Sequence, residues 1–439
     1  MNEPHVICMV SDFFYPNMGG VENHIFQVSE CLMSRGHKVI VVTHAYGDRT
    51  GVRYLSEFLK VYYLPLYPPF YNQVIFPSVI GLIPILRDIF IREQIEIVHC
   101  HSAFSTLGLE AVSIAICFGL KCIFTDHSLF GFADASAILM NKVLELAMVN
   151  VSHAICVSYV SKQNTYLRTK MQPERIYVIP NAVDTKAFLP DPSARDPNYI
   201  TISIMSRLVY RKGMDLVAGI LPEICGRHKD VRFMIGGDGP KRKLLDEVCD
   251  MHNLHQQVTF LGGQNHVDVP KHLVKADIFL NPSLTEAFCV AMCEAVSCGL
   301  QVVSTNVGGI PEVLPPGMVE LCQPNVQALC DGLEICIQNV RDNNIPDPWE
   351  YHNKMEEFYN WHNIAERTEI VYDSARDQPT RSRAELLITA YSLGPVIGKL
   401  VVILYSISMA LLLLCSVVWP KSNIDIVPEY GFHRKRKSK

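Results

Sequence analysis

The chain has 439 residues, enough for two domains of about 180 residues and an additional segment. Hydrophobic residues make up 49% of it and charged residues 19%, which excludes extensive disorder and predicts a large buried core. A net charge of −5 with a pI near 6.3 argues against a nucleic-acid-binding protein.

The first half of the chain alternates short β-branched apolar runs with amphipathic helical stretches. This pattern is typical of parallel βαβ units. The first run ends at a Gly19-Gly20 turn, and a helix is predicted to follow it over residues 21–35. The predicted strands of this half cover residues 6–12, 39–44, 61–65, 95–101, 122–127, 153–158 and 175–181.

A second series of the same kind begins at Tyr199, after a proline-rich stretch over residues 188–198. The prediction is therefore an α/β protein with two Rossmann-like doubly wound domains, over residues 1–187 and 199–348, joined by a linker at 188–198. Amphipathic helices are predicted over residues 349–380. The strands of the second series are predicted at residues 200–206, 231–237, 258–263, 277–283 and 301–307.

The segment from Leu400 to Trp419 is an uncharged run of twenty residues. As a helix it is long enough to span about 30 Å of hydrocarbon, so it predicts one C-terminal transmembrane helix, followed by a basic tail over residues 420–439. No basic and apolar leader precedes the first strand, and the fifteen cysteines form no CxxC pair. Both observations favour a cytosolic location for the two domains. The basic residues within 434–439 favour the opposite orientation by the positive-inside rule, but they begin about fifteen residues past the apolar run, near the limit of that rule.

The most informative motif is SLTEAFCVAMCE over residues 283–294, which holds two glutamates eight positions apart. If the segment is one helix, Glu286 and Glu294 are separated by roughly 12 Å and lie on one broad side of it. That is about the reach of a nucleotide sugar. Ser283 and Glu286 also have the spacing of a capping box, in which Glu286 would only bond the start of its own helix.

Other candidate ligand groups follow predicted strands, where parallel sheets bind ligands. Gly19 and Gly20 suit a phosphate at a helix start, or form a plain tight turn. Arg207 and Lys212 suit a diphosphate, or belong to a solvated basic turn. Gly308, Gly309 and Glu312 follow the fifth strand of the second series. Together these signals predict an anionic nucleotide clamped in a cleft between the two domains.

His127 leaves a strand of the first domain in the stretch FTDHSLFG, and we interpret it as a residue near the reacting sugar rather than a structural hydrogen-bonder. His99 and His101 are better explained by a strand end than by a metal site, and no Asp-x-Asp motif is present. The stretch IGGDGP lacks the third glycine of a dinucleotide fingerprint, which argues against a dehydrogenase.

These residues resemble the retaining glycosyltransferases of the GT-B fold, the group marked by a glutamate, seven residues and a second glutamate. The resemblance covers nearly the whole chain before the apolar run. It is carried by GGVENH at Gly19, TDHSLFGFAD at Thr125, IPNAVD at Ile179, SRLVYRKG at Ser206, SLTEAFC at Ser283 and VSTNVGGIPEVL at Val303.

Within this group the chain resembles the family that begins glycosylphosphatidylinositol (GPI) anchor synthesis. That resemblance implies transfer of N-acetylglucosamine from UDP-GlcNAc to phosphatidylinositol with retention of configuration. It implies that Glu286 holds hydroxyls of the donor sugar and that Glu294 binds the ribose. Arg207 and Lys212 would neutralise the diphosphate in place of a metal, so no cofactor is expected. Gly19 and Gly20 would approach the diphosphate, His127 the sugar or the incoming hydroxyl, and Gly308, Gly309 and Glu312 the nucleotide.

The resemblance also implies a multisubunit complex in the endoplasmic reticulum membrane, with a single crossing and the catalytic domains in the cytosol. Lys60, Arg87 and Arg92 are the candidate partners for the phosphate of the acceptor lipid. The motifs leave open a transferase of the same fold that uses GDP-mannose and another lipid acceptor. They also leave open a non-catalytic membrane scaffold that keeps the fold.

Overall fold

The computed structural model describes residues 3–68, 74–129 and 135–428. The chain divides into two compact units. The first contains residues 1–157, 161–179 and 362–439, and the second contains residues 158–160 and 180–361. The second unit thus begins before the predicted linker at 188–198, and the chain returns to the first unit after Trp361.

Within its described residues, the first unit is built on an eight-stranded sheet with strand order β3-β4-β2-β1-β5-β6-β7-β8. All neighbouring strands are parallel except β3 and β4. The strands are β1 (Val6–Val10), β2 (Lys38–His44), β3 (Gly51–Tyr54), β4 (Lys60–Leu64), β5 (Ile97–His101), β6 (Lys121–Asp126), β7 (His153–Cys156) and β8 (Ile176–Val178).

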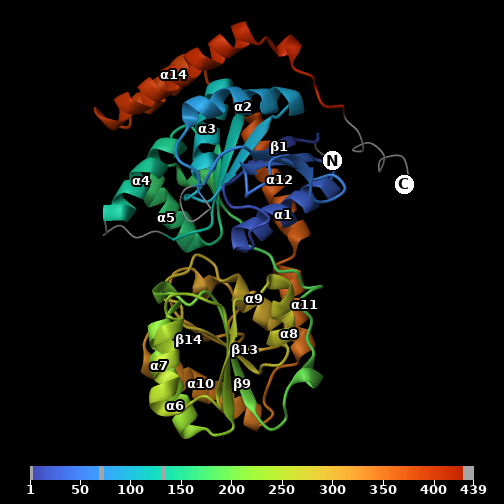
Figure 1. Cartoon of the computed structure of the whole chain (residues 1–439), viewed down its shortest axis with the longest axis vertical. Helices are drawn as coiled ribbons and strands as arrows, with labels where there is room; N and C mark the ends of the chain where they lie inside the picture. The colour runs from blue at the N-terminus through green and yellow to red at the C-terminus, as the bar shows by residue number, and fades with distance from the viewer. Residues whose placement is uncertain (1–2, 69–73, 130–134, 429–439) are drawn as a thin grey trace. The chain divides into compact units, whose positions relative to one another are not determined.

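Eight helices accompany this sheet in the part of the chain that the structure describes (Figure 1). They are α1 (Gly20–Ser34), α2 (Val79–Glu93), α3 (Thr106–Phe118), α4 (Ala135–Met148), α5 (Tyr159–Thr169), α12 (Trp361–Asp377), α13 (Arg383–Tyr391) and α14 (Ile397–Val418). Short 3₁₀ turns lie at Pro173–Arg175 and Lys421–Asn423.

The second unit is built on a six-stranded sheet with order β11-β10-β9-β12-β13-β14, and every pair is parallel. Its strands are β9 (Ile200–Met205), β10 (Val231–Gly236), β11 (Val258–Gly262), β12 (Ile278–Asn281), β13 (Gln301–Thr305) and β14 (Glu320–Cys322). Its helices are α6 (Met214–Arg227), α7 (Arg242–His252), α8 (Val269–Leu273), α9 (Val290–Ser297), α10 (Val326–Arg341) and α11 (Pro348–Phe358). Its 3₁₀ turns are Pro192–Ala194, Tyr210–Lys212, His266–Asp268 and Ile310–Glu312.

Both sheets reverse their strand order at an internal strand. In the first unit β1 lies between β2 and β5, and in the second unit β9 lies between β10 and β12. Ligands of doubly wound sheets bind beyond the carboxyl ends of the strands at such a reversal. The predicted doubly wound fold is therefore confirmed, and it directs attention to the loops after β1, β5, β9 and β12.

Each unit has its own apolar core. In the first, side chains of β1, β2 and β5 pack with α2 and α3, and in the second, side chains of β9, β10 and β12 pack with α6 and α10. Helix α12 returns to the first unit because polar contacts hold it there. The Tyr372 hydroxyl lies 2.7 Å from His99 Nδ1, and the Asp373 carboxylate lies 2.8 Å from His5 Nε2.

Helix α14 is long and apolar enough to cross a membrane by length and composition. One stripe of it, which includes Val401, Tyr405, Met409 and Leu412, packs into the core of the first unit beside α2 and α3 (Figure 1). Its opposite stripe, which includes Leu400, Ile403, Ile407 and Leu414, is exposed. The basic part of the predicted tail, residues 434–439, lies outside the described residues.

Candidate active site

Glu286 lies in the loop between β12 and α9, not on a helix. The predicted single helix over residues 283–294 is wrong, because α9 begins only at Val290, after Cys289 as its N-cap. Because no helix begins directly after Ser283, the capping-box interpretation of Ser283 and Glu286 is also excluded. The Ser283 hydroxyl lies instead 3.0 Å from Glu286 Oε1 and orients its carboxylate.

The Lys212 ammonium pairs with the Glu286 carboxylate, and both side chains are largely buried. Burial alone would lower the pKa of Lys212, but the Glu286 carboxylate outweighs it and the pKa is raised. Lys212 is therefore a fixed positive charge at neutral pH. It reaches this position because Gly213 has φ +73°, and any Cβ there would lie 1.8 Å from the Pro282 carbonyl oxygen.

Arg207 follows β9 and is exposed, and among the described residues no carboxylate forms an ion pair with it. Its positive charge acts to lower the pKa of Lys212, so the two cations lie within electrostatic reach of each other. The loop after β10 packs tightly against this one. Gly237 has φ +128°, and a Cβ there would lie 1.8 Å from the Ser206 carbonyl oxygen.

The glycines after β13 support the Glu286 loop. The Gly309 N–H donates to the Glu286 carbonyl oxygen at 2.9 Å, and a Cβ on Gly309 would lie 2.1 Å from the Ala287 carbonyl oxygen. Gly308 has φ +55° and makes the turn. Glu312 accepts hydrogen bonds from the N–H groups of Tyr159 and Val160, at 2.6 and 2.9 Å. Both carboxylate oxygens of Glu312 thus have protein partners.

Glu294 lies on α9, is buried, and contacts His266 Nε2 at 2.8 Å through its Oε1. The hydrogen bond to Glu294 raises the pKa of His266. The sequence interpretation did not include His266, because it lies in a 3₁₀ turn of the second unit and belongs to none of the quoted motifs.

In the first unit, Gly19 caps α1 in an extended conformation and Gly20 is the first residue of the helix. A Cβ on Gly19 would lie 2.4 Å from a carboxylate oxygen of Glu22, so this side chain folds back over the helix start. A phosphate bound at the Gly19 and Gly20 amides would meet that carboxylate. The predicted role of the two glycines thus requires Glu22 to change its position.

His127 follows β6, with its Nε2 3.2 Å from Nδ1 of His101 at the end of β5. The His24 ring of α1 lies 4.7 Å away, centre to centre. Burial lowers the pKa of His101 and His127, so both imidazoles are neutral. One ligand nitrogen from each of the three histidines lies within 4.8 Å of the others, a spacing that would also suit a metal ion.

The three predicted acceptor-binding cations lie in the first unit, in different surroundings. The Lys60 ammonium lies 2.7 Å from the buried carboxylate of Glu93. Arg87 is buried and donates to the Trp419 carbonyl oxygen at 2.9 Å. Arg92 is exposed at the last turn of α2. Arg92 is thus the exposed side chain of the three, while Lys60 pairs with a carboxylate and Arg87 is buried.

Comparison with known proteins identifies the family of this chain. Residues 44–134 match the sequence profile of the family described as PIGA (GPI anchor biosynthesis), and residues 185–347 match glycosyl transferases group 1. A phosphatidylinositol N-acetylglucosaminyltransferase subunit of Homo sapiens is 52% identical over 96% of this chain and 87% of its own length. The chain belongs to the PIGA family of phosphatidylinositol N-acetylglucosaminyltransferase subunits. The relative of the same name in Arabidopsis thaliana is 48% identical over 96% of this chain and 94% of its own length.

Solved structures place this family member in the GT-B fold. Sucrose-phosphate synthase from Thermosynechococcus elongatus aligns with a TM-score of 0.69 at 18% identity, over 84% of this chain and 98% of the other. Anabaena Alr3699/HepE in complex with UDP aligns with a TM-score of 0.65 at 16% identity, over 84% of this chain and 100% of the other. The protein is thus a glycosyltransferase of the GT-B fold, as predicted.

Proposed function

We propose that this protein transfers N-acetylglucosamine from UDP-GlcNAc to phosphatidylinositol, with retention of anomeric configuration, as the first step of GPI-anchor synthesis. Membership in the PIGA family supports the substrates, since the relatives carry this activity in their names. The single observation that supports the chemistry best is the largely buried Lys212–Glu286 pair, which lies in the loops after β9 and β12, where the strand order of the second sheet reverses.

In this proposal the second unit holds the donor. Glu286 accepts hydrogen bonds from hydroxyls of the sugar, and Glu294 accepts them from the ribose. Arg207 and Lys212 bind the diphosphate and stabilise the charge that develops as UDP leaves. Gly308 and Gly309 shape the loop around the nucleotide, and Glu312 fixes the neighbouring backbone of Tyr159 and Val160.

The reaction proceeds by attack on the same face from which UDP departs. The acceptor oxygen forms its bond to the anomeric carbon while the bond to the UDP oxygen breaks, and the hydroxyl proton passes to the leaving diphosphate. His127 contacts the sugar or the incoming hydroxyl from the first unit, where its neutral imidazole can accept or donate a hydrogen bond. Of the cations predicted to bind the acceptor phosphate, Arg92 is exposed, but it lies just before β5, at the amino ends of the strands, whereas His127 follows the carboxyl end of β6.

We further propose that transfer needs no metal, since two cations act on the diphosphate. Rates measured with EDTA should equal those measured without it. A strict requirement for a divalent cation would contradict this part of the proposal, and the cluster of His24, His101 and His127 would then be the place to look for the ion.

The relatives are named as subunits, so the protein is one component of a transferase. We propose that it works with other subunits in the endoplasmic reticulum membrane, attached through a single crossing by α14, with both units in the cytosol. The test of the whole proposal is a transfer assay on the purified complex with labelled UDP-GlcNAc and phosphatidylinositol. Labelled GDP-mannose serves as the competing donor, and its use in place of UDP-GlcNAc would refute the assignment.

A further inference from the structure

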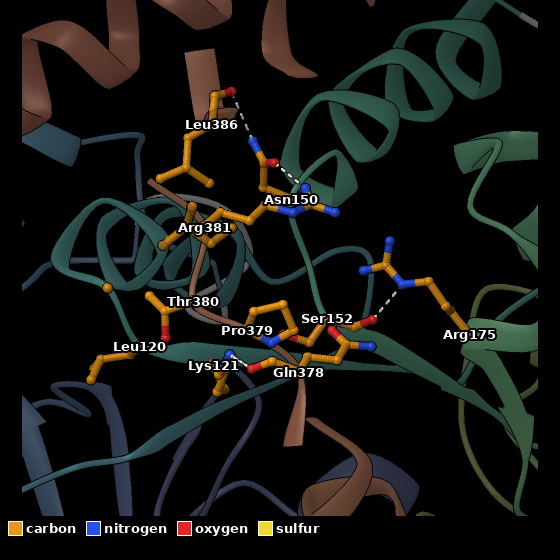
Figure 2. A pocket seen from close by; sticks show the side chains of 12 residues that line it. Leu120, Lys121, Asn150, Ser152, Arg175, Gln378, Pro379, Thr380, Arg381 and Leu386 are labelled. Carbon is orange, nitrogen blue, oxygen red and sulfur yellow. Dashed lines mark hydrogen bonds between the residues drawn. The ribbon is translucent and has the colours of Figure 1, made fainter. Parts of the chain in front are cut away.

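A small open pocket lies on the surface of the first unit, beside α13 (Figure 2). It is lined by the turn before β6, the turn after α4, the 3₁₀ turn before β8, and the connection from α12 to α13. Three lining residues are cationic, namely Lys121, Arg175 and Arg381, and no lining residue is acidic. The start of β6, the 3₁₀ turn before β8 and the connection from α12 to α13 thus each supply one positive charge to the pocket.

Neutral oxygens hold each of these cations in place (Figure 2). Lys121 Nζ donates to the Gln378 carbonyl oxygen. Arg175 Nε donates to the Ser152 carbonyl oxygen at 2.7 Å, and Arg381 Nη1 donates to Asn150 Oδ1 at 2.6 Å. Asn150 is itself fixed by a 3.3 Å bond from its amide to the Leu386 carbonyl oxygen. The positive groups are therefore positioned by the fold and not by opposite charges.

Among the residues that the structure describes, none of the three forms an ion pair with a carboxylate. Burial lowers the pKa of Lys121 and of Arg175, and the positive charge of Arg381 lowers both further. The pKa of the nearby Glu385 is lowered chiefly by bonds from Ser382, with a smaller effect from Arg381, and its carboxylate caps the start of α13. Glu385 thus offsets part of the charge of Arg381 from outside the pocket lining, and an anion within the pocket would relieve the repulsion that remains among the three cations.

The pocket is separate from the proposed transfer site. Lys121 is the first residue of β6, Ser152 directly precedes β7, and Arg175 directly precedes β8, so the pocket lies at the amino ends of three neighbouring parallel strands. His127 follows the carboxyl end of β6. The six residues of β6 separate the two ends by roughly 20 Å.

The surroundings of the pocket favour an amphiphilic ligand. Leu386 of α13 lines it, and the same short helix exposes Ile388 and Tyr391 by 70% and 55%. Leu386 also belongs to the core cluster that contains Tyr405 of α14, the apolar helix that we assign to the membrane. The cations thus lie close to the chain's proposed entry into the lipid.

We propose that this pocket binds the phosphate group of an anionic phospholipid and is a second lipid site, distinct from the acceptor site. The phosphate oxygens accept hydrogen bonds from Lys121, Arg175 and Arg381, and the acyl chains lie along the exposed apolar face of α13. Such a site would hold the first unit against an anionic membrane surface without taking part in transfer.

The test measures equilibrium binding of dioctanoyl phosphatidic acid, below its micellar concentration, to the purified full chain in neutral detergent. This lipid has a phosphate but no inositol, so it cannot act as the acceptor. Lys121→Gln combined with Arg381→Gln should weaken binding by about tenfold or more, since each removes a charge-assisted hydrogen bond. Arg381→Lys should restore most of the affinity lost in Arg381→Gln alone, because it restores the charge.

The matched control is Arg383→Gln combined with Lys399→Gln, which removes the same charge from exposed positions that do not line the pocket. An equal loss of affinity in this control would show diffuse attraction and overturn the proposal. Unchanged lipid binding by the Lys121→Gln and Arg381→Gln variant would also overturn the proposal. This holds even if that variant no longer associated with another subunit. Inorganic phosphate should bind more weakly than the lipid, and equal affinity would overturn the assignment to a lipid. Transfer by the pocket variant at saturating substrates should be unchanged, which separates this test from that of the proposed function.

Discussion

The backbone N–H of Gly309 donates a 2.9 Å hydrogen bond to the carbonyl oxygen of Glu286. This bond joins the loop after β13 to the loop after β12, and it holds the loop from which the Glu286 side chain reaches Lys212. The position of the proposed catalytic carboxylate therefore depends on a glycine more than twenty residues away in the chain.

Gly309→Ala should displace the Glu286 loop, because its Cβ would lie 2.1 Å from the Ala287 carbonyl oxygen. We expect a loss of about 1–3 kcal/mol in the free energy of unfolding, as for other overpacked sites, together with a large loss of transfer. Gly226→Ala is the matched control, since a Cβ there meets nothing within 4 Å and alanine favours its helix. Urea unfolding and transfer rates check both variants, and normal transfer by Gly309→Ala would refute the supporting role.

Arg207→Ala should reduce the transfer rate by about 10²–10³, the usual effect of removing one group that stabilises developing negative charge. Arg211→Ala is the control, because Arg211 is exposed in the adjacent 3₁₀ turn and its substitution removes the same positive charge. Its rate should remain near that of the unaltered protein. Equal losses in both variants would mean that general positive charge, and not a contact from Arg207, assists the reaction.

His266 should stabilise the second unit in a pH-dependent way. Its pKa is raised in the folded state, mainly by the hydrogen bond to Glu294, so its stabilisation is complete below the unfolded pKa of about 6.5 and is lost as the pH rises through the folded value. The difference in unfolding free energy between the unaltered protein and His266→Gln should therefore be larger at about pH 6 than at about pH 9. We expect less than about 1 kcal/mol, since the His266 side chain is 39% exposed. A difference that does not change with pH would contradict the ionic contribution.

The proposed single crossing by α14 is tested by protease added to sealed microsomes. The two units should be digested and a tag fused after Lys439 should be spared. A membrane crossing would break the hydrogen bond from Arg87 to the Trp419 carbonyl oxygen. If the tag is digested, α14 does not cross the membrane, and Trp419 can stay beside Arg87. The sequence Asn150-Val151-Ser152 is an N-glycosylation acceptor, and a glycan on Asn150 would also contradict the cytosolic placement. The absence of a glycan would not replace the protease test, because Asn150 is buried in the folded unit.

Much of the fold could be predicted from the sequence, because each parallel strand is a short apolar run with a turn signal after it. The missed strands have weak signals. Strand β3 (Gly51–Tyr54) is exposed at a sheet edge, and β14 (Glu320–Cys322) has only three residues. Helix α13 (Arg383–Tyr391) was also missed, although its Ser382 and Glu385 form a capping box with the required spacing.

The site was predicted less completely than the fold. The sequence predicted that residues following different strands lie close together. Two of them, Lys212 and Gly309, do contact Glu286. The helix predicted to contain Glu286 was wrong because hydrogen bonds to other loops hold that segment in an irregular conformation, including one from the Leu284 N–H to the Arg211 carbonyl oxygen. His24 could have been found, as it follows Gly20 by one helical turn within the GGVENH motif. Pairing of His266 with Glu294 depends on the three-dimensional fold and has no local signal.

The most direct measurement of the central claim is GlcNAc transfer by Glu286→Gln in the purified complex, with UDP binding measured on the same sample. The account predicts that transfer is almost abolished while UDP binding stays near normal, because Glu286 acts on the sugar and not on the nucleotide. Glu247→Gln, at an exposed position on α7, should leave both quantities unchanged. Near-normal transfer by Glu286→Gln would contradict the catalytic assignment and, with it, the proposed mechanism.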